Sequence, residues 1–185
     1  MDEFNYSLWE EEEELPARSR LYSLPMEECG NRAQESLLDY CHRLAHAHRV
    51  KVIELLRAEV IPHTQIRGAM NSNRFSEEYA KTINGYGKYA VQIAEVLEEL
   101  TGQASLACGT FAHWRPILDP KGNGLLNHIR QWCPSCLAEA HEGGWPVTFP
   151  LIWAVANITH CAIHLTRLRQ TCRYHDNRHR RHAHG

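Results

Sequence analysis

The sequence lacks any long apolar run, and this absence limits where the protein is expected to reside. None of its 185 residues belongs to a stretch of eighteen consecutive apolar residues, so no transmembrane helix is expected. The opening segment, Met1-Asp2-Glu3-Phe4, has neither the basic start nor the apolar core of a signal peptide. We therefore expect a cytoplasmic protein, whose 43% hydrophobic content is enough to bury a core.

The motifs of several enzyme classes are also missing. A zinc deaminase needs a His-x-Glu pair ahead of a Pro-Cys-x-x-Cys segment, but no such pair precedes Cys133, and Trp132 occupies the proline position. The sequence contains no His-Glu-x-x-His, P-loop or Gly-x-Ser-x-Gly motif. We predict a protein that is not an enzyme and has no catalytic residues.

The seven cysteines are an odd number in a chain without a secretory signal. Metal binding or simple burial accounts for such thiols better than a disulfide framework. Cys29, Cys41 and Cys108 stand alone in the sequence, and we expect them to be reduced.

Two Cys/His pairs with the spacing of metal ligands occur in the C-terminal part of the chain. Cys133 and Cys136 form one pair, and Cys161 and His164 form the other. Two intervening residues allow a tight turn to bring both side chains to one metal ion. Three thiolates and one imidazole favour zinc, with iron as the main competitor, and four protein ligands leave no open position for a reactive water. We predict a structural zinc site; the alternative is four unrelated buried residues.

A second metal site is predicted less directly by the histidine-rich end of the chain. Cys172 and His175 repeat the two-residue spacing, and His179 and His182 follow them. These four residues are candidate ligands for a second zinc ion. The alternative is a solvated basic arm that meets acidic partners through its arginines.

Helical periodicity dominates the first two thirds of the chain. It predicts helices near residues 34–45, 50–60 and 89–100, with a short fourth helix within 103–111. Asn31 is the expected cap of the first helix, Pro62 ends the second, and Gly102 closes the third. Short helices with tight connections fit a helix-turn-helix unit, although helical hairpins that touch no nucleic acid have the same pattern.

We predict a mainly α fold with a small zinc-stabilised α+β region: an N-terminal helix-turn-helix unit followed by one or two zinc-finger or zinc-ribbon elements. The net charge of −2 conceals an acidic beginning and a basic end. The acidic beginning is expected to be a flexible arm, or else a peptide that docks in a basic groove. The predicted segments are 1–14 for this arm, 15–115 for the helical domain, 116–130 for a linker, 131–170 for the zinc domain, and 171–185 for the tail.

Two blocks of this sequence resemble the TniQ/TnsD family of transposition target-selection proteins. The first block begins with Arg18-Ser19-Arg20-Leu21-Tyr22-Ser23-Leu24-Pro25 and continues to Val50. The second joins Trp132-Cys133-Pro134-Ser135-Cys136-Leu137 to Pro150-Leu151-Ile152-Trp153 and the Cys/His pairs that follow. Unlike many members of the family, this chain has His175 at a cysteine position and lacks a long C-terminal region, so it is similar to the short members found with CRISPR-associated transposons.

The resemblance implies a bacterial, non-enzymatic adaptor in DNA transposition. Such an adaptor links a target-bound complex, here an RNA-guided CRISPR effector with its guide RNA and target DNA, to the AAA+ ATPase that recruits the transposase. The pI near 6.7 indicates that contact with nucleic acid is weak for the chain alone. A homodimer is an open alternative, and the competing function is a zinc-containing, sequence-specific transcription regulator.

Overall fold

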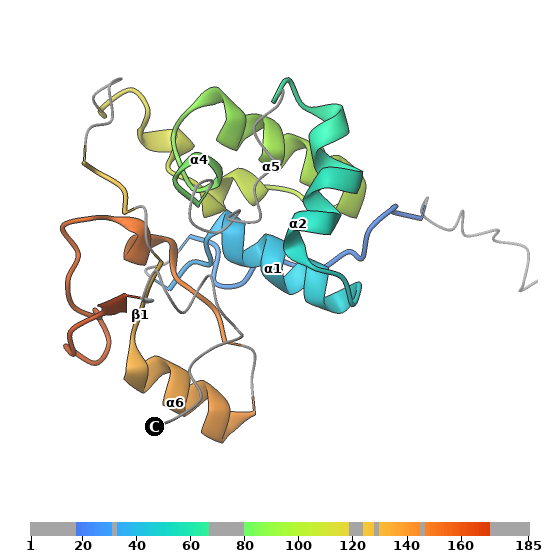
Figure 1. The fold of residues 1–185 in the computed structure, drawn as a ribbon. Coiled ribbons are helices and arrows are strands. Elements are labelled where there is room, and N and C mark those ends of the chain that lie inside the picture. The colour runs from blue at the N-terminus through green and yellow to red at the C-terminus, as the bar shows by residue number, and fades with distance from the viewer. Residues whose placement is uncertain are drawn as a thin grey trace, which may run out of the picture.

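Helices form most of the fold, and the only sheet in the described part of the chain has two short strands (Figure 1). The computed structural model describes residues 18–30, 33–66, 80–118, 124–127, 130–144 and 147–170. The α-helices are α1 (Leu37–Ala47), α2 (Val52–Leu55), α4 (Ala80–Ile83), α5 (Lys88–Thr101) and α6 (Pro134–Gly143). Shorter helical turns are η2 (Leu56–Val60), η3 (Ile61–His63), η5 (Leu106–Gly109), η6 (Ala112–Trp114) and η7 (Leu151–Ala154).

Helix α1 begins at a side-chain cap and buries one face. The Ser36 hydroxyl accepts a hydrogen bond from the Asp39 backbone N–H at 3.2 Å, which satisfies a donor that a helix start otherwise leaves unpaired. Asn31, the predicted cap, lies outside the described residues, and the helix starts later than its predicted start. The apolar positions recur at helical spacing and are buried, as predicted: Leu37, Leu38, Cys41, Leu44 and Ala45.

The other predicted helices are also present. The second runs through α2 and the π-helical turn η2 to Val60, and the turn that follows contains Pro62. The third is α5, and Gly102 ends it in the left-handed conformation with φ of 68°, where a glycine avoids the steric cost of a Cβ. The short fourth helix is η5, a 3₁₀ turn.

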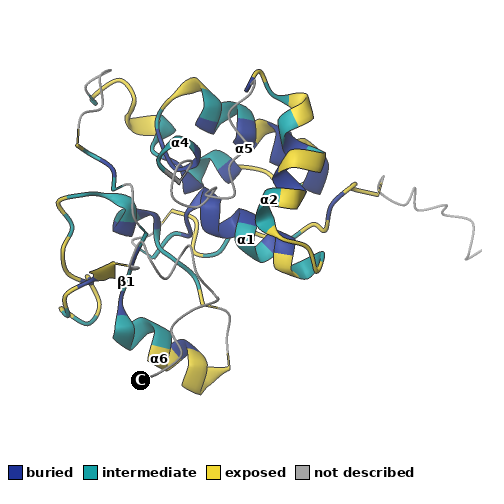
Figure 2. Ribbon diagram, in the orientation of Figure 1, coloured by how far each residue is buried: buried dark blue, intermediate teal, exposed yellow. Residues whose placement is uncertain are grey.

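The largest hydrophobic cluster joins these helices, and Figure 2 shows their facing sides as buried. Leu97 of α5 and Leu106 of η5 are fully buried in it. Gly109, at the end of η5, lies against the start of α1: a Cβ here would stand 2.8 Å from the Leu37 backbone nitrogen and 2.7 Å from Met26 Cε. The two segments can pack this closely only because residue 109 has no side chain.

A disulfide between Cys29 and Cys108 corrects the prediction that both cysteines are reduced. Their Cα atoms are 6.5 Å apart, within the range that a disulfide spans. The two residues are 79 positions apart in sequence, and only the folding of the segment before α1 onto η5 brings them together. Cys41 is a free thiol, and its burial raises its pKa.

The C-terminal part, predicted to be α+β, contains the small sheet and one helix, whose bounds the sequence pattern did not predict. Strands β1 (Gln131–Trp132) and β2 (Arg169–Gln170) pair antiparallel, with Trp132 opposite Arg169. Helix α6 follows β1 and lies apart from α1 and α5 (Figure 1). A second, smaller cluster buries Cys133, Trp153, Cys161 and Leu168.

The prediction of a mainly helical protein with a small α+β region is confirmed. The helix-turn-helix assignment stays a prediction, as do the segment boundaries. The acidic arm and the basic tail lie outside the described residues. Within the described part of the chain, no helix combines the length and apolar character that crossing a bilayer requires.

Candidate metal centre

The first ligand pair lies at the start of a helix. Cys133 is the N-cap of α6, Pro134 is its first residue, and Cys136 is in its first turn. Proline suits this position because its missing N–H would have no helical partner. The turn that brings the two cysteines together is the first turn of a helix of 10 residues.

The second ligand pair lies in a compact turn. The Leu165 N–H donates to the Cys161 carbonyl at 3.0 Å, and the Cys161 N–H donates to the Thr166 carbonyl at 2.9 Å. The Ile163 N–H points at Cys161 Sγ, 3.4 Å away. These bonds wrap the backbone around the Cys161 sulfur and turn His164 towards it.

The four predicted ligands converge on one point. One donor atom from each of Cys133, Cys136, Cys161 and His164 lies within 4.8 Å of all the others. The Cys136 and Cys161 sulfurs are 3.6 Å apart, and His164 Nδ1 lies 3.6, 3.3 and 3.7 Å from the sulfurs of Cys133, Cys136 and Cys161. A zinc tetrahedron with ordinary bond lengths has edges of about 3.8 Å between two sulfurs and about 3.6 Å between sulfur and nitrogen. These four separations lie close to those edges, and the cluster could hold a metal ion such as zinc.

Two further side chains support the ligands, and sequence analysis identified neither of them. Glu139 Oε1 lies 2.8 Å from His164 Nε2, so the carboxylate accepts the proton on the ring nitrogen that faces away from the cluster and leaves Nδ1 to bind metal. Glu139 follows Cys136 by three positions on α6, so a predicted helix here would have placed both on one face. The Thr166 hydroxyl lies 3.2 Å from Cys133 Sγ.

The side chains of the cluster shift one another's pKa values in opposite directions. Burial raises the pKa of Cys133, but hydrogen bonds from the Thr166 hydroxyl and the Cys136 backbone outweigh it and bring that pKa to about 6. Burial and the neighbouring sulfurs raise the pKa of Cys136. The hydrogen bond with Glu139 raises the pKa of His164 to about 9. A metal ion displaces these protons when it binds, because thiolate and neutral imidazole are the ligating forms.

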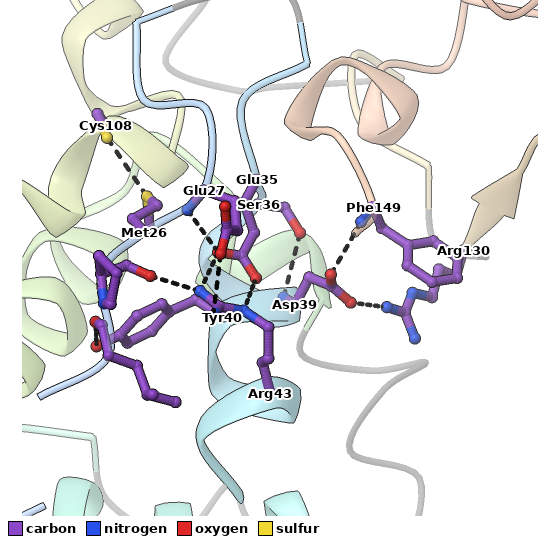
Figure 3. Close-up of polar contacts among 12 residues, drawn as sticks. Met26, Glu27, Glu35, Ser36, Asp39, Tyr40, Arg43, Cys108, Arg130 and Phe149 are labelled. Atoms are coloured by element: carbon purple, nitrogen blue, oxygen red, sulfur yellow. Dashed lines mark hydrogen bonds and ion pairs between the residues drawn. The ribbon is translucent and has the colours of Figure 1, made fainter. Parts of the chain in front are cut away.

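A buried polar network joins the metal region to α1 (Figure 3). The Asp39 carboxylate forms an ion pair with Arg130 and accepts the Phe149 backbone N–H at 2.9 Å. The Arg130 guanidinium lies 3.5 Å from the centre of the Phe149 ring. Two backbone bonds add to this contact, from the Ser36 N–H to the Phe149 carbonyl and from the Leu151 N–H to the Gln34 carbonyl. The start of α1 and the metal region therefore share a hydrogen-bonded boundary.

A second buried ion pair stands beside this network. The Glu35 side chain is fully buried, and Arg43 donates to it at 2.9 and 2.8 Å. Arg43 also donates to the Pro25 carbonyl, and Glu35 accepts the Glu27 N–H at 3.1 Å. The pair thus ties the segment before α1 to the helix (Figure 3), and paired burial of this kind avoids the large cost of an isolated charge.

One edge of the metal region is basic. Leu168 points into the small cluster, while Arg167 and Arg169 on either side of it are exposed, as the alternation of a strand requires. Both arginines line a cleft of about 720 Å³ together with Thr159, Thr166 and Gln131. The predicted second set, Cys172, His175, His179 and His182, lies outside the described residues, so this second site stays a prediction.

The model of the TniQ family matches residues 29–168, a range that contains α1, α5 and all four ligands of the cluster. A search of curated proteins found no match.

Proposed function

Because this chain belongs to the TniQ family, which gives it a role associated with transposition, we propose that it is a non-enzymatic adaptor. It would link a target-bound complex, an RNA-guided CRISPR effector with its guide RNA and target DNA, to the AAA+ ATPase that recruits the transposase. The family match over residues 29–168 carries this proposal. The chain would work in the bacterial cytoplasm.

The metal cluster supports an adaptor rather than a catalyst. We propose that Cys133, Cys136, Cys161 and His164 hold one zinc ion, since their four donor atoms all lie within 4.8 Å of one another and are of the types that zinc binds. Four protein ligands saturate that geometry and leave no position for a reactive water. The zinc would stabilise a surface for recruitment in residues 131–170, beside a helical unit in 15–115.

Contact with nucleic acid is the weaker part of the interaction. The tail after residue 170 contains four arginines and a single aspartate, a balance that suits phosphate contacts. The whole chain, however, carries a net charge of −2, which disfavours tight autonomous binding to DNA. We therefore expect protein contacts to provide most of the affinity.

Co-purification tests the proposal. The full chain, loaded with zinc, is co-expressed with the AAA+ ATPase and, separately, with the CRISPR effector complex, and each is isolated through a tag on the partner. We expect stable association with at least one of them and weak, salt-sensitive binding to duplex DNA without a partner. Tight, sequence-specific binding to a short duplex by the isolated chain, with no association with either partner, would instead identify a transcription regulator.

A further inference from the structure

The disulfide between Cys29 and Cys108 joins an exposed residue to a half-buried one. Cys29 lies on the turn of residues 27–30 before α1, and it is the only exposed cysteine in the described part of the chain. Cys108 belongs to η5 and is half-buried. Cys41 is fully buried, and a buried thiol is unreactive; the remaining described cysteines belong to the metal cluster. Cys29 is therefore the residue of this set that oxidants in solution reach most easily.

Hydrogen bonds hold the turn of Cys29 in place independently of the disulfide. The Glu35 N–H donates to the Glu27 carbonyl, and the Glu27 N–H donates to the Glu35 carboxylate, both at 3.1 Å. The Gly30 N–H donates to the Gln34 side-chain oxygen at 3.0 Å. None of these bonds involves a cysteine, so reduction leaves them in place and keeps the two thiols close together. Thiols held in this way form a disulfide again readily, because the bond closes within one molecule.

The surroundings of Cys108 also suit a reduced thiol. Met26 Sδ lies 3.4 Å from Cys108 Sγ (Figure 3), so the thiol can donate a weak hydrogen bond to the thioether when the disulfide is open. The large hydrophobic cluster around α1 and α5 contains neither Cys29 nor Cys108. The packing of the core therefore does not depend on the disulfide, and both oxidation states have a folded structure.

We propose that Cys29 and Cys108 are a reversible oxidation site, a dithiol in the reducing cytoplasm and a disulfide when a hydroperoxide accumulates. The proposal takes the cytoplasmic location from the function proposed above. In cytoplasmic proteins of most organisms, a disulfide is usually transient and either catalytic or redox-sensing. Exposed disulfides are also the ones that cellular thiols reduce easily.

The oxidation takes two steps. The Cys29 sulfur, as a thiolate, attacks one oxygen of hydrogen peroxide; the O–O bond breaks, Cys29 becomes a sulfenic acid, and the other oxygen leaves as water with the proton of the thiol. The Cys108 sulfur then attacks the Cys29 sulfur, the S–O bond breaks, and a second water leaves with the Cys108 proton. Two thiols and one peroxide thus give one disulfide and two waters.

The charges beside Cys29 limit the rate of the first step. Glu27 and Glu28 directly precede Cys29, and Glu27 is paired with Arg43 at 3.5 Å. Positive groups beside a thiol favour the reactive thiolate, and carboxylates have the opposite effect. We therefore expect the pair to respond to sustained oxidation and not to a brief pulse of peroxide.

Oxidation restrains two walls of an apolar cleft. Cys108 and Gln34 both line a cleft of about 560 Å³, together with Trp114 and Leu151. Gly30 bonds to Gln34, so the disulfide ties the turn that supports one wall to η5, which forms another. In the dithiol, only noncovalent contacts join these two segments.

The test follows thiols and zinc in the full chain loaded with zinc. The protein is treated with excess reduced glutathione, then with hydrogen peroxide, and the remaining thiols are alkylated and mapped by mass spectrometry. We expect wild type to lose the two thiols of Cys29 and Cys108 without releasing zinc, and reduced glutathione to restore both. Cys29→Ser should form no disulfide with Cys108. In Cys108→Ser, Cys29 should stop at a sulfenic acid, which a dione probe captures.

Cys41→Ala is the control variant, because Cys41 is buried and should not take part; it should lose the same two thiols as wild type. In wild type, the amide of Gly30 should exchange about threefold more slowly, or slower still, in the disulfide form. The amide of Leu97 should exchange equally in both forms.

Four results would overturn the proposal. A disulfide that survives excess reduced glutathione in the folded protein is structural. Release of zinc at the peroxide concentration that oxidises Cys29 makes the metal cluster the sensitive site. A sulfinic acid at Cys29 of wild type shows that Cys108 does not trap the sulfenic acid. Equal exchange at Gly30 in both forms refutes the restraint of the cleft. Each is measured on the isolated protein, so failure of the adaptor function leaves the test valid.

Discussion

Removal of zinc should unfold the metal region while the helical core stays folded. The perturbation is a strong chelator added to the full chain under reducing conditions. Chelation removes the ion that would join α6 to the turn of Cys161 and His164 at the cluster, and leaves only the hydrogen bonds of His164 with Glu139 and of Thr166 with Cys133 between them. The core around α1 and α5 has its own large set of buried side chains and none of the four ligands.

The expected magnitude follows from what the small cluster buries. Two of its four buried residues are ligands, so Trp153 and Leu168 are the buried apolar residues that remain. Burial of two such side chains stabilises by about 3–6 kcal/mol, whereas a structural zinc site contributes about 10–16 kcal/mol at neutral pH. The larger contribution is lost on chelation, and the smaller one cannot offset the conformational entropy of the region.

Amide hydrogen exchange followed by mass spectrometry measures this directly. We expect the amides of Cys161 and Leu165 to lose their protection after chelation, and the amide of Leu97 in the middle of α5 to keep it. The amide of Ser36, which donates to the Phe149 carbonyl, should lose protection although it belongs to the helical part. Excess zinc should restore the original pattern. An unchanged pattern after complete removal of metal, or simultaneous exposure of Leu97, would refute this reasoning.

Three further predictions concern single residues. Glu139→Gln should weaken zinc affinity about tenfold or more, because the carboxylate orients His164; competition with a chromophoric chelator measures it, and wild-type affinity would contradict this role. Gly109→Ala should cost about 1–3 kcal/mol of unfolding free energy in urea, because the new Cβ meets the α1 backbone, and a neutral result would mean that η5 packs less closely. Burial raises the pKa of Asp39 from 3.8 to about 6, so ionisation of this carboxyl group favours the unfolded chain. The stabilisation that follows from the raised pKa is therefore complete below about pH 4 and is lost as the pH rises through about 6. With excess zinc, the free energy of unfolding of wild type minus that of Asp39→Asn should therefore fall by about 1 kcal/mol from about pH 5 to about pH 7; a flat or rising difference would show that Arg130 dominates.

Local patterns predicted the features that depend on nearby residues. The apolar stripe from Leu37 to Ala45 specified the buried face of α1, and Gly102 marked the end of α5. The paired spacing of Cys133, Cys136, Cys161 and His164 identified residues that the structure brings together. Each of these features is set by residues only a few positions apart: the period of a helix, the left-handed backbone at its end, or the spacing of two ligands.

The missed features depend on distant contacts or on competing local signals. The start of helix α6 at the cysteine pair was missed because Cys133 and Cys136 were interpreted as part of a turn, although Pro134 also suits a helix start. Glu139 was missed with it. The pairing of Asp39 with Arg130 joins residues far apart in sequence, and so does the disulfide between Cys29 and Cys108. No periodicity reports such contacts, since they form only when whole segments pack.

The disulfide has a consequence for any measurement on this protein. When oxidised, it turns the polypeptide from Cys29 to Cys108 into a covalent ring that contains α1, α2, α4 and α5. In the chain-entropy model a ring of this size lowers the conformational entropy of the unfolded state by an amount worth about 4.5 kcal/mol, and a reductant opens the ring. A melting temperature recorded under oxidising conditions therefore describes a protein whose unfolded chain is cross-linked, and one recorded with reductant describes a protein whose unfolded chain is not.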